Sequence, residues 1–288
     1  MSARWSAKIA ETGFAVTMVI LALANGAQAD VVGSLRDCGL IAGEKGVVSE
    51  VIDGDTLILK TDPRKTLSQV AERQVRLVGI QAPKLPLGRQ GFEPWPMGEA
   101  AKAVLEKMTL HKEVQLFYGE TREDRHGRTL AHVLVSSRSG TRQWAEKALL
   151  ERGFARVYSF ADNRFCVEAM LGFERKARAS RAGIWSQNFY AVRPHHQAGQ
   201  FLGSFQLVEG RVLDVAEVRT GVYLNFEENW REDFTIFVAR RDLRRFGGKE
   251  HELGLLEGQK IRVRGWLTLR NGPMIDVTHP EQIEIPDD

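Results

Sequence analysis

The order of short strand-like and helical segments is the feature that most constrains the fold of this chain. The residues of 47–52 and 56–60 follow a period of two and are rich in Val, Ile and Leu, as expected for strands. Asp53-Gly54-Asp55 separates these two runs, and Asp-Gly between β-branched runs is a strong hairpin signal. Further strands are predicted at 73–80, 113–118 and 129–135, and helices at 100–108, 144–150 and 166–181. Five strands interleaved with three helices predict a mainly β chain that forms a five-stranded β-barrel of the OB type.

A second unit is predicted after this barrel, because a chain of 288 residues usually divides into two domains. The first domain is assigned to residues 46–190, and the Gln-, Gly- and His-rich residues 191–204 are interpreted as a linker. Residues 205–288 contain five further strand-like runs, at 205–215, 222–226, 234–238, 260–269 and 274–278. A charged segment at 240–256 is predicted to be helical. This pattern predicts a second small β-barrel, of OB-like type.

The first 29 residues have the pattern of a secretory signal peptide. Arg4 and Lys8 precede an apolar run over 14–24, and Ala27-Gln28-Ala29 follows it as a small-x-small cleavage site. The alternative is a membrane anchor, but this run of about a dozen residues is shorter than the roughly 20 that span a bilayer. The pattern predicts cleavage after Ala29, a secreted or periplasmic protein without a membrane span, and an N-terminal arm over 30–45.

The chain has two cysteines, Cys38 and Cys166. In an oxidising compartment an even number of cysteines indicates a disulfide, which here would join the N-terminal arm to the third predicted helix. The alternative is a pair of buried free thiols. The sequence favours the disulfide.

The net charge of +3 conceals an asymmetry between the two halves of the chain. Residues 30–200 contain 26 Lys and Arg against 20 Asp and Glu, whereas residues 201–288 contain 12 against 16. Since local potential matters more than the total, the first half is the better candidate for contact with phosphate.

Three features of the first half suggest chemistry on a phosphodiester. The turn at Asp53 and Asp55 brings two carboxylates to one hairpin end, where a hard cation could bind. Arg76 lies inside an apolar strand and therefore needs a carboxylate or a phosphate as partner. Arg128 follows a glycine at the edge of another strand. Two arginines and a metal-binding carboxylate on one barrel face would stabilise the charge that develops on a phosphodiester during hydrolysis.

Five ordered segments resemble the staphylococcal nuclease (thermonuclease) family. They are Val51 through Leu57, Val75 through Pro83, Gly98-Glu99-Ala100, Asp124-Arg125-His126-Gly127-Arg128, and Glu174 through Trp185. The resemblance covers about residues 46–187. It implies an OB-type barrel with three helices that hydrolyses DNA and RNA phosphodiesters with calcium, and it makes nucleic acid the expected partner.

The resemblance transfers some site residues and breaks at others. Asp55 matches a calcium-ligating aspartate, with Asp53 beside it as outer support, and Arg76 and Arg128 match the two arginines that hold the scissile phosphate. The family has a second metal-ligating aspartate two residues before the proline of this motif, where this chain has Gln81. It has a glutamate as general base directly after that proline, where this chain has Lys84.

These two replacements predict a nucleic-acid-binding homologue with weak or lost hydrolysis. An amide in place of a carboxylate weakens calcium binding, and an ammonium at position 84 repels the cation and cannot act as a base. One alternative is an active metal-dependent endonuclease with a rebuilt site, in which Glu93 or Glu99 supplies the base or Lys84 grips phosphate. Another is an envelope interaction module that keeps the barrel as a scaffold. The sequence names no protein partner.

One strand of the second domain also carries basic and aromatic residues. Arg262, Arg264, Trp266 and Arg270 share one face of the strand at 260–269 and its end, where they could stack on and steer a single strand of nucleic acid. The alternative is an ordinary solvated strand face, which the excess of acidic residues in this half supports.

Overall fold

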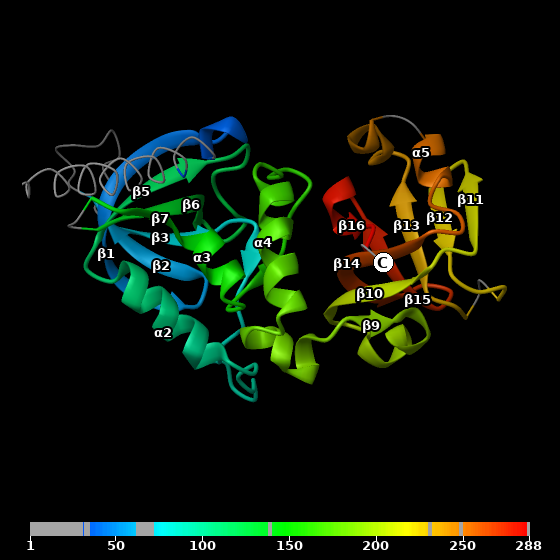
Figure 1. Cartoon of the computed structure of the whole chain (residues 1–288), viewed down its shortest axis with the longest axis horizontal. Coiled ribbons are helices and arrows are strands. Elements are labelled where there is room, and N and C mark those ends of the chain that lie inside the picture. Colours follow the sequence, from blue (N-terminus) through cyan, green and yellow to red (C-terminus); the bar gives the residue numbers. More distant parts are fainter. Residues whose placement is uncertain are drawn as a thin grey trace, which may run out of the picture.

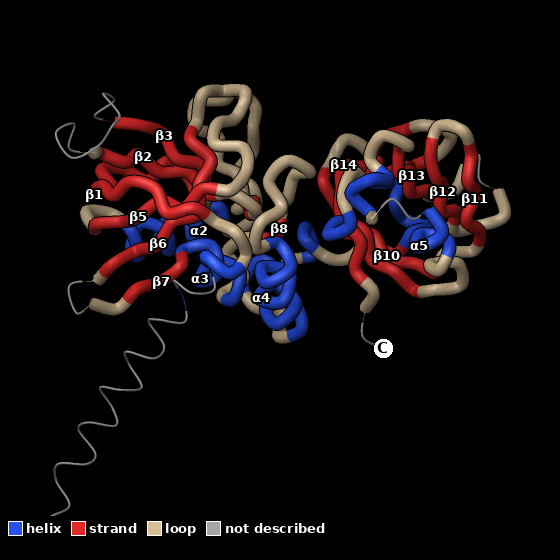
Figure 2. The backbone as a smooth tube through the Cα atoms, turned by 90° about the horizontal axis from the view of Figure 1, so that it is seen from above, coloured by secondary structure: helices blue, strands red, loops and turns tan. Residues whose placement is uncertain are grey.

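The computed structural model describes residues 31, 35–61, 72–137, 140–229, 232–247 and 250–286. The predicted signal peptide and its cleavage site after Ala29 lie outside the described residues. Two β-rich bodies lie side by side, with the helix α4 (Val167–Ala179) of the first body on the side that faces the second (Figures 1 and 2). Within the described part of the chain, no helix is both long and apolar enough to cross a bilayer.

The first body is a closed barrel of five strands. Its sheet contains β1 (Ile41–Asp53), β2 (Thr56–Lys60), β3 (Glu72–Leu77), β5 (Glu113–Tyr118), β6 (Thr129–Ser136) and the short β7 (Arg142–Trp144). The strand order is β3-β2-β1-β5-β6-β7, and a parallel pairing of β3 with β6 closes the ring. The predicted fold class is therefore confirmed.

In the described part of the chain, the helices with given bounds on this barrel are three. They are α2 (Gly98–Thr109), α3 (Ala145–Glu151) and α4. In α2 the buried residues Ala101, Leu105 and Met108 recur at helical spacing and pack against β1, which is why this segment forms a helix with one apolar face. A separate two-stranded sheet pairs β4 (Ile80–Gln81) with β8 (Arg156–Val157), and β4 leads directly into the segment that contacts the β1–β2 turn.

Cys38 and Cys166 form a disulfide. The bond joins the segment before β1 to the N-terminus of α4, across 128 residues of sequence. It therefore encloses most of the first barrel in one covalent loop.

The second body is also a barrel. Its strands are β10 (Phe205–Arg211), β11 (Asp214–Val218), β12 (Gly221–Asn225), β13 (Thr235–Ala239), β14 (Lys260–Leu269), β15 (Pro273–Val277) and β16 (Ile283–Glu284). The short helices η4 (Leu243–Phe246) and α5 (Glu250–Gly254) lie between β13 and β14, and η5 (Pro280–Gln282) precedes β16. The sheet order is β11-β12-β13-β15-β14-β10-β9, in which β13 and β15 are parallel.

The stretch interpreted as a linker is folded onto the second barrel. It contains β9 (Arg193–Pro194), which pairs in parallel with β10, and η3 (His195–Phe201), whose Ala198 is fully buried. Just before it, η1 (Gly183–Ser186) and η2 (Asn188–Tyr190) bring Trp185 and Tyr190 into an apolar cluster with Phe205 of β10. The two barrels therefore share buried surface instead of being joined by a free segment.

Candidate functional site

The turn between β1 and β2 places two aspartates inside the first barrel. Asp53 pairs with Thr56 across the hairpin, and the Asp55 N–H donates to Asp53 Oδ1 at 3.1 Å, which fixes the turn. Gly54 is the residue that this turn requires, because a Cβ there would lie 2.7 Å from that of Ala82 and 2.8 Å from that of Ala101. The turn is thereby packed against the segment after β4 and against α2, and Asp55 is fully buried.

Arg76 is the first cation that contacts this carboxylate. Its position on β3 faces Thr56 of β2, and its Nη1 lies 2.6 Å from Asp55 Oδ1. The other end of the guanidinium donates to the Ile80 carbonyl at 2.8 Å. The sequence argument that Arg76 needs a carboxylate or a phosphate is thus met by Asp55, and Arg76 is almost completely buried.

Lys84 is the second cation, and its ammonium lies between the two aspartates. Its Nζ donates to Asp55 Oδ1 and Oδ2 at 2.9 and 2.8 Å, and it lies 3.4 Å from Asp53 Oδ2. The Ala82 N–H also donates to Asp55 Oδ2, at 2.7 Å. Both oxygens of Asp55 therefore accept hydrogen bonds, and each of them contacts the Lys84 ammonium.

The charges in this site cancel. Two carboxylates, Asp53 and Asp55, face two cations, Arg76 and Lys84. Burial would raise the pKa of Asp55, but Arg76 and Lys84 hold that pKa well below its usual range. Burial and the neighbouring Asp55 carboxylate raise the pKa of Asp53. An added divalent cation would leave a net charge of about +2 in a mostly buried site, which is costly without further anions.

Gln81 does not face these carboxylates. Its Oε1 accepts hydrogen bonds from Nε and Nη2 of Arg156, at 3.0 and 2.7 Å, across the β4–β8 pairing. Arg156 also donates to the Phe205 carbonyl at 3.1 Å, so this contact links β4 to the second barrel. Gln81 occupies the sequence position of a metal ligand of the family, but in the structure its amide oxygen is bound by the buried Arg156.

Arg156 is a functional candidate that the sequence reasoning missed. It is 3% exposed, and its guanidinium lies near the rings of Trp95, Tyr190 and Phe205, at 5.7, 5.7 and 4.5 Å. Burial lowers its pKa to about 10. The same signal that singled out Arg76, a lone arginine within an apolar run, was present in Ala155-Arg156-Val157.

Arg128 lies beside β3, the strand that carries Arg76. It immediately precedes Thr129, which pairs with Val75 next to Arg76. Its guanidinium lies 2.6 Å from Asp124 of its own loop, and its side chain is 28% exposed. Arg128 is thus the more accessible of the two predicted phosphate-binding arginines.

The residues present do not fit the calcium site that the resemblance implies. Calcium takes six to eight oxygen ligands at about 2.3–2.6 Å, but both oxygens of Asp55 already accept hydrogen bonds from nitrogen donors, including the Lys84 ammonium. Among the described residues, no three His, Cys, Asp or Glu side chains are grouped so that they could hold a metal ion. Glu93 and Glu99, the suggested replacement bases, are exposed.

In the second barrel, three of the four predicted nucleic-acid-binding residues face other protein groups. Arg264 is 1% exposed and donates to both Glu174 of α4 and Glu284 of β16. Arg262 forms an ion pair with Glu209. Trp266 is exposed, but its Nε1 donates to the Tyr158 hydroxyl at 3.0 Å. Arg264 and Trp266 therefore contact α4 and the segment after β8, and Arg262 contacts the neighbouring strand β10, an arrangement that differs from the solvated face given as the alternative.

Arg270 differs from these three. It is exposed beyond the end of β14, and its Nη2 donates to the Tyr223 hydroxyl at 3.0 Å. It does not belong to the ion pairs that join the barrels.

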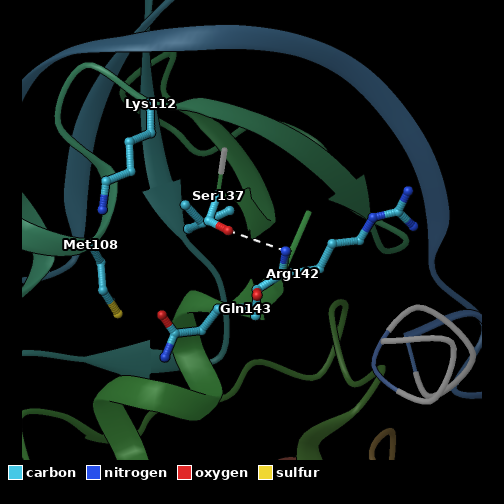
Figure 3. Close-up of a pocket in the computed structure, with 7 residues that line it drawn as sticks. Met108, Lys112, Ser137, Arg142 and Gln143 are labelled. Atoms are coloured by element: carbon cyan, nitrogen blue, oxygen red, sulfur yellow. Dashed lines mark hydrogen bonds between the residues drawn. The ribbon is translucent and has the colours of Figure 1, made fainter. Parts of the chain in front are cut away.

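A small cavity on the first barrel has no link to the aspartate site. It holds about 280 Å³ and is lined by side chains from the ends of α2, β6 and β7, namely Met108, Lys112, Val135, Ser137, Thr141, Arg142 and Gln143 (Figure 3). The Thr141 N–H donates to Ser137 Oγ across its wall, at 3.1 Å. None of the predicted site residues lines it.

The chain is similar in sequence to several known proteins. A family model described as staphylococcal nuclease homologue matches residues 74–187. The Escherichia coli protein ParB is 34% identical over 154 residues, which is 52% of this chain and 76% of that protein. A thermonuclease of Staphylococcus intermedius is 29% identical over 150 residues, 51% of this chain and 79% of that protein. The endonuclease YncB of Bacillus subtilis is 26% identical over 147 residues, 50% of this chain and 63% of that protein. The family model ends before the second barrel.

Proposed function

Because the chain belongs to the staphylococcal nuclease homologue family, we propose that it is a secreted or periplasmic nucleic-acid-binding protein whose calcium-dependent hydrolysis is weak or lost. The observation that carries this proposal is the position of the Lys84 ammonium between Asp53 and Asp55. The side chain that stands in the place of the family's base is itself the cation that the carboxylates bind.

Two parts of the family's hydrolytic machinery are affected by this arrangement. A protonated amine cannot take a proton from an attacking water, and the loss of a general base costs a factor of roughly 10²–10⁴ in rate. The carboxylate that calcium would need is satisfied by Lys84, and Gln81 is held by Arg156. A metal ion must therefore displace the Lys84 ammonium from Asp53 and Asp55, at a site whose charges already cancel.

Binding of a phosphodiester rests on two cations whose side chains are partly exposed. Arg128 and Lys84 are 28% and 21% exposed at their side chains, and Arg128 needs only to exchange its local partner Asp124 for a phosphate. Arg suits this contact because its planar fork matches two phosphate oxygens. The excess of basic residues over 30–200 favours the approach of a polyanion.

The proposed location outside the cytoplasm has two supports. One is the signal-peptide pattern of residues 1–29. The other is the disulfide between Cys38 and Cys166, since such bonds persist in oxidising compartments.

The test is to measure binding and cleavage of single-stranded DNA and RNA by the purified protein, with calcium and with chelator. We expect binding that is weakened by Arg128→Gln and little or no cleavage in either condition. Chelator-sensitive cleavage that is lost in Asp55→Ala would refute the loss of hydrolysis and favour an active nuclease with a rebuilt site. Absence of both binding and cleavage would favour the scaffold alternative.

A further inference from the structure

The second barrel has a cavity whose lining includes one of the four residues predicted to bind nucleic acid, Arg270. It holds about 500 Å³, within the range of small-molecule sites, and opens on the sheet formed by β11, β12 and β13. Its lining includes Asp214, Tyr223, Asn225, Thr235, Arg270 and Met274.

The position of this cavity is set by the strand order. β10 and β11 act as two halves of a first strand, since β10 pairs with β14 and β11 with β12. β12, β13, β14 and β15 are then strands two to five, arranged in the order 1-2-3-5-4-1 with strands three and five parallel. Barrels of the OB type bind oligonucleotides and oligosaccharides on strands two and three, between the loops 1–2 and 4–5. The cavity includes Thr220 and Asn271 of these two loops.

One wall of the cavity is aromatic. The ring of Tyr223 lies against that of Phe237, with centroids 4.5 Å apart and planes 32° apart. The Arg270 guanidinium lies 4.8 Å from the centre of the Phe237 ring and donates to the Tyr223 hydroxyl. Tyr223 is therefore braced from behind and from its edge, as a stacking platform for a planar ring needs to be.

The floor of the cavity is polar. Asn225 is buried, donates to Asp214 Oδ2 at 3.2 Å and accepts from Thr235 Oγ1 at 3.4 Å. Amide, hydroxyl and carboxylate groups in one row can exchange hydrogen bonds with the edge of a nucleobase, which carries both donors and acceptors.

The positive charge at the rim suits a planar ligand that carries an anionic group. Arg270 is exposed, and among the described residues its side-chain partners are the Tyr223 hydroxyl and the Phe237 ring, not a carboxylate. An exposed guanidinium beside a stacking ring suits a phosphate that is attached to a stacked nucleoside. A neutral oligosaccharide would bring no negative charge to this cation.

We propose that the cavity between β11, β12, β13 and the β14–β15 turn binds a nucleotide unit of single-stranded nucleic acid, with a base on Tyr223 and a phosphate on Arg270. This site shares no residue with the aspartate site of the first barrel, and it does not depend on the fate of hydrolysis there. It gives the second barrel a function of its own.

The test is the fluorescence anisotropy of a labelled 12-nucleotide single-stranded DNA, titrated with the full-length protein in chelator. An Arg128→Gln background lowers the proposed contribution of the first barrel, and every second-barrel variant is compared with this parent, so that failure of the first proposal leaves the comparison unchanged. Tyr223→Leu keeps an apolar side chain but removes the ring, and Tyr223→Phe keeps the ring. Arg211→Gln is the matched control for Arg270→Gln. Arg211 is an exposed arginine that donates to the Gly258 carbonyl, and it pairs with Lys260 at the start of β14, whereas Arg270 follows the end of β14.

We expect Tyr223→Leu to weaken binding roughly 5- to 140-fold, the range of one base–aromatic stack, and Tyr223→Phe to stay within about threefold of its parent. Arg270→Gln should weaken binding and lower the slope of log K against log salt by about 0.7, the value for one phosphate of a single strand. Arg211→Gln should change neither. Thermal melting verifies that each variant is folded.

Three results would overturn the proposal. They are no binding in the Arg128→Gln background, equal binding by Tyr223→Leu and Tyr223→Phe, or displacement of the DNA by a neutral oligosaccharide that binds more tightly at the same cavity.

Discussion

Removal of the Lys84 ammonium has a consequence that can be worked out from the structure. In Lys84→Met the stem of the side chain remains and Asp55 keeps its ion pair with Arg76, but among the described residues Asp53 keeps no ion-pair partner. Asp55 is fully buried, so solvent does not fully replace the lost contacts at 2.8 and 2.9 Å. Removing one partner of a buried ion pair costs roughly 3–5 kcal/mol.

The expected loss lies near the lower end of this range, because the Lys84 side chain is 21% exposed and Arg76 still contacts Asp55. We expect a loss of about 3 kcal/mol, which corresponds to a decrease in Tm of about 6–12 °C for a chain of this size. Lys102→Met is the matched control. Lys102 is 30% exposed and pairs with Glu106 at 3.9 Å along α2, so its removal should cost only about 0.3–0.5 kcal/mol.

Calcium distinguishes this explanation from a simple loss of packing. In Lys84→Met the two carboxylates have no ammonium between them, so a divalent cation can enter. With a Kd of about 1 mM, 10 mM calcium would restore about 1.4 kcal/mol, and the unsubstituted protein should gain almost nothing. The assay is urea and thermal denaturation with calcium and with chelator. If Lys84→Met loses no more stability than Lys102→Met, or if calcium stabilises both proteins equally, the reasoning is refuted.

The other predictions concern the metal motif, the pH dependence and the disulfide. Gln81→Asp combined with Lys84→Glu should fail to restore calcium-dependent cleavage, because Arg156 would bind the new carboxylate as it now binds the amide. Addition of Arg156→Met to this double variant should allow cleavage. Cleavage by the double variant alone would contradict this explanation. Burial raises the pKa of Glu146 from its usual 4.5 to about 8, so the native state keeps a proton that the unfolded chain releases. Stability should therefore fall by up to about 1.4 kcal/mol per pH unit between pH 4.5 and 8, and a urea titration of Glu146→Gln should show a flatter decline. Cys38→Ser should cost about 4–5 kcal/mol, since the disulfide closes a loop of 128 residues; a change in Tm under 3 °C would contradict this.

The barrel could be predicted because its signals are local. The Asp53-Gly54-Asp55 turn, the period-two runs and the helical spacing of Ala101, Leu105 and Met108 are each set by neighbours in sequence. The family resemblance is confirmed by the family model and by the thermonuclease relatives.

Within the site, the need of Arg76 for a partner could be predicted, but not the geometry of its surroundings. Gln81 and Arg156 are 75 residues apart and meet only through the pairing of β4 with β8. The ammonium of Lys84 reaches Asp55 because the segment after β4 passes over the hairpin, where Ala82 also donates to Asp55. Such contacts depend on how distant segments pack, and no pattern in the sequence specifies them.

The contact between the two barrels could not be predicted from the sequence either, as the face of β14 shows. Alternation predicts which residues share a face with Arg264, but it does not say what that face contacts. In the structure Arg264 lies between Glu174 and Glu284, since the second barrel packs on α4. A buried, doubly paired arginine and a solvated one have the same sequence pattern.

The most direct test of the central claim is a crystal structure of the protein grown or soaked in at least 10 mM calcium. We predict that Lys84 Nζ remains within hydrogen-bonding distance of both oxygens of Asp55, with no calcium bound between Asp53 and Asp55. Calcium at about 2.3–2.6 Å from an Asp55 oxygen, with Lys84 displaced into solvent, would contradict it.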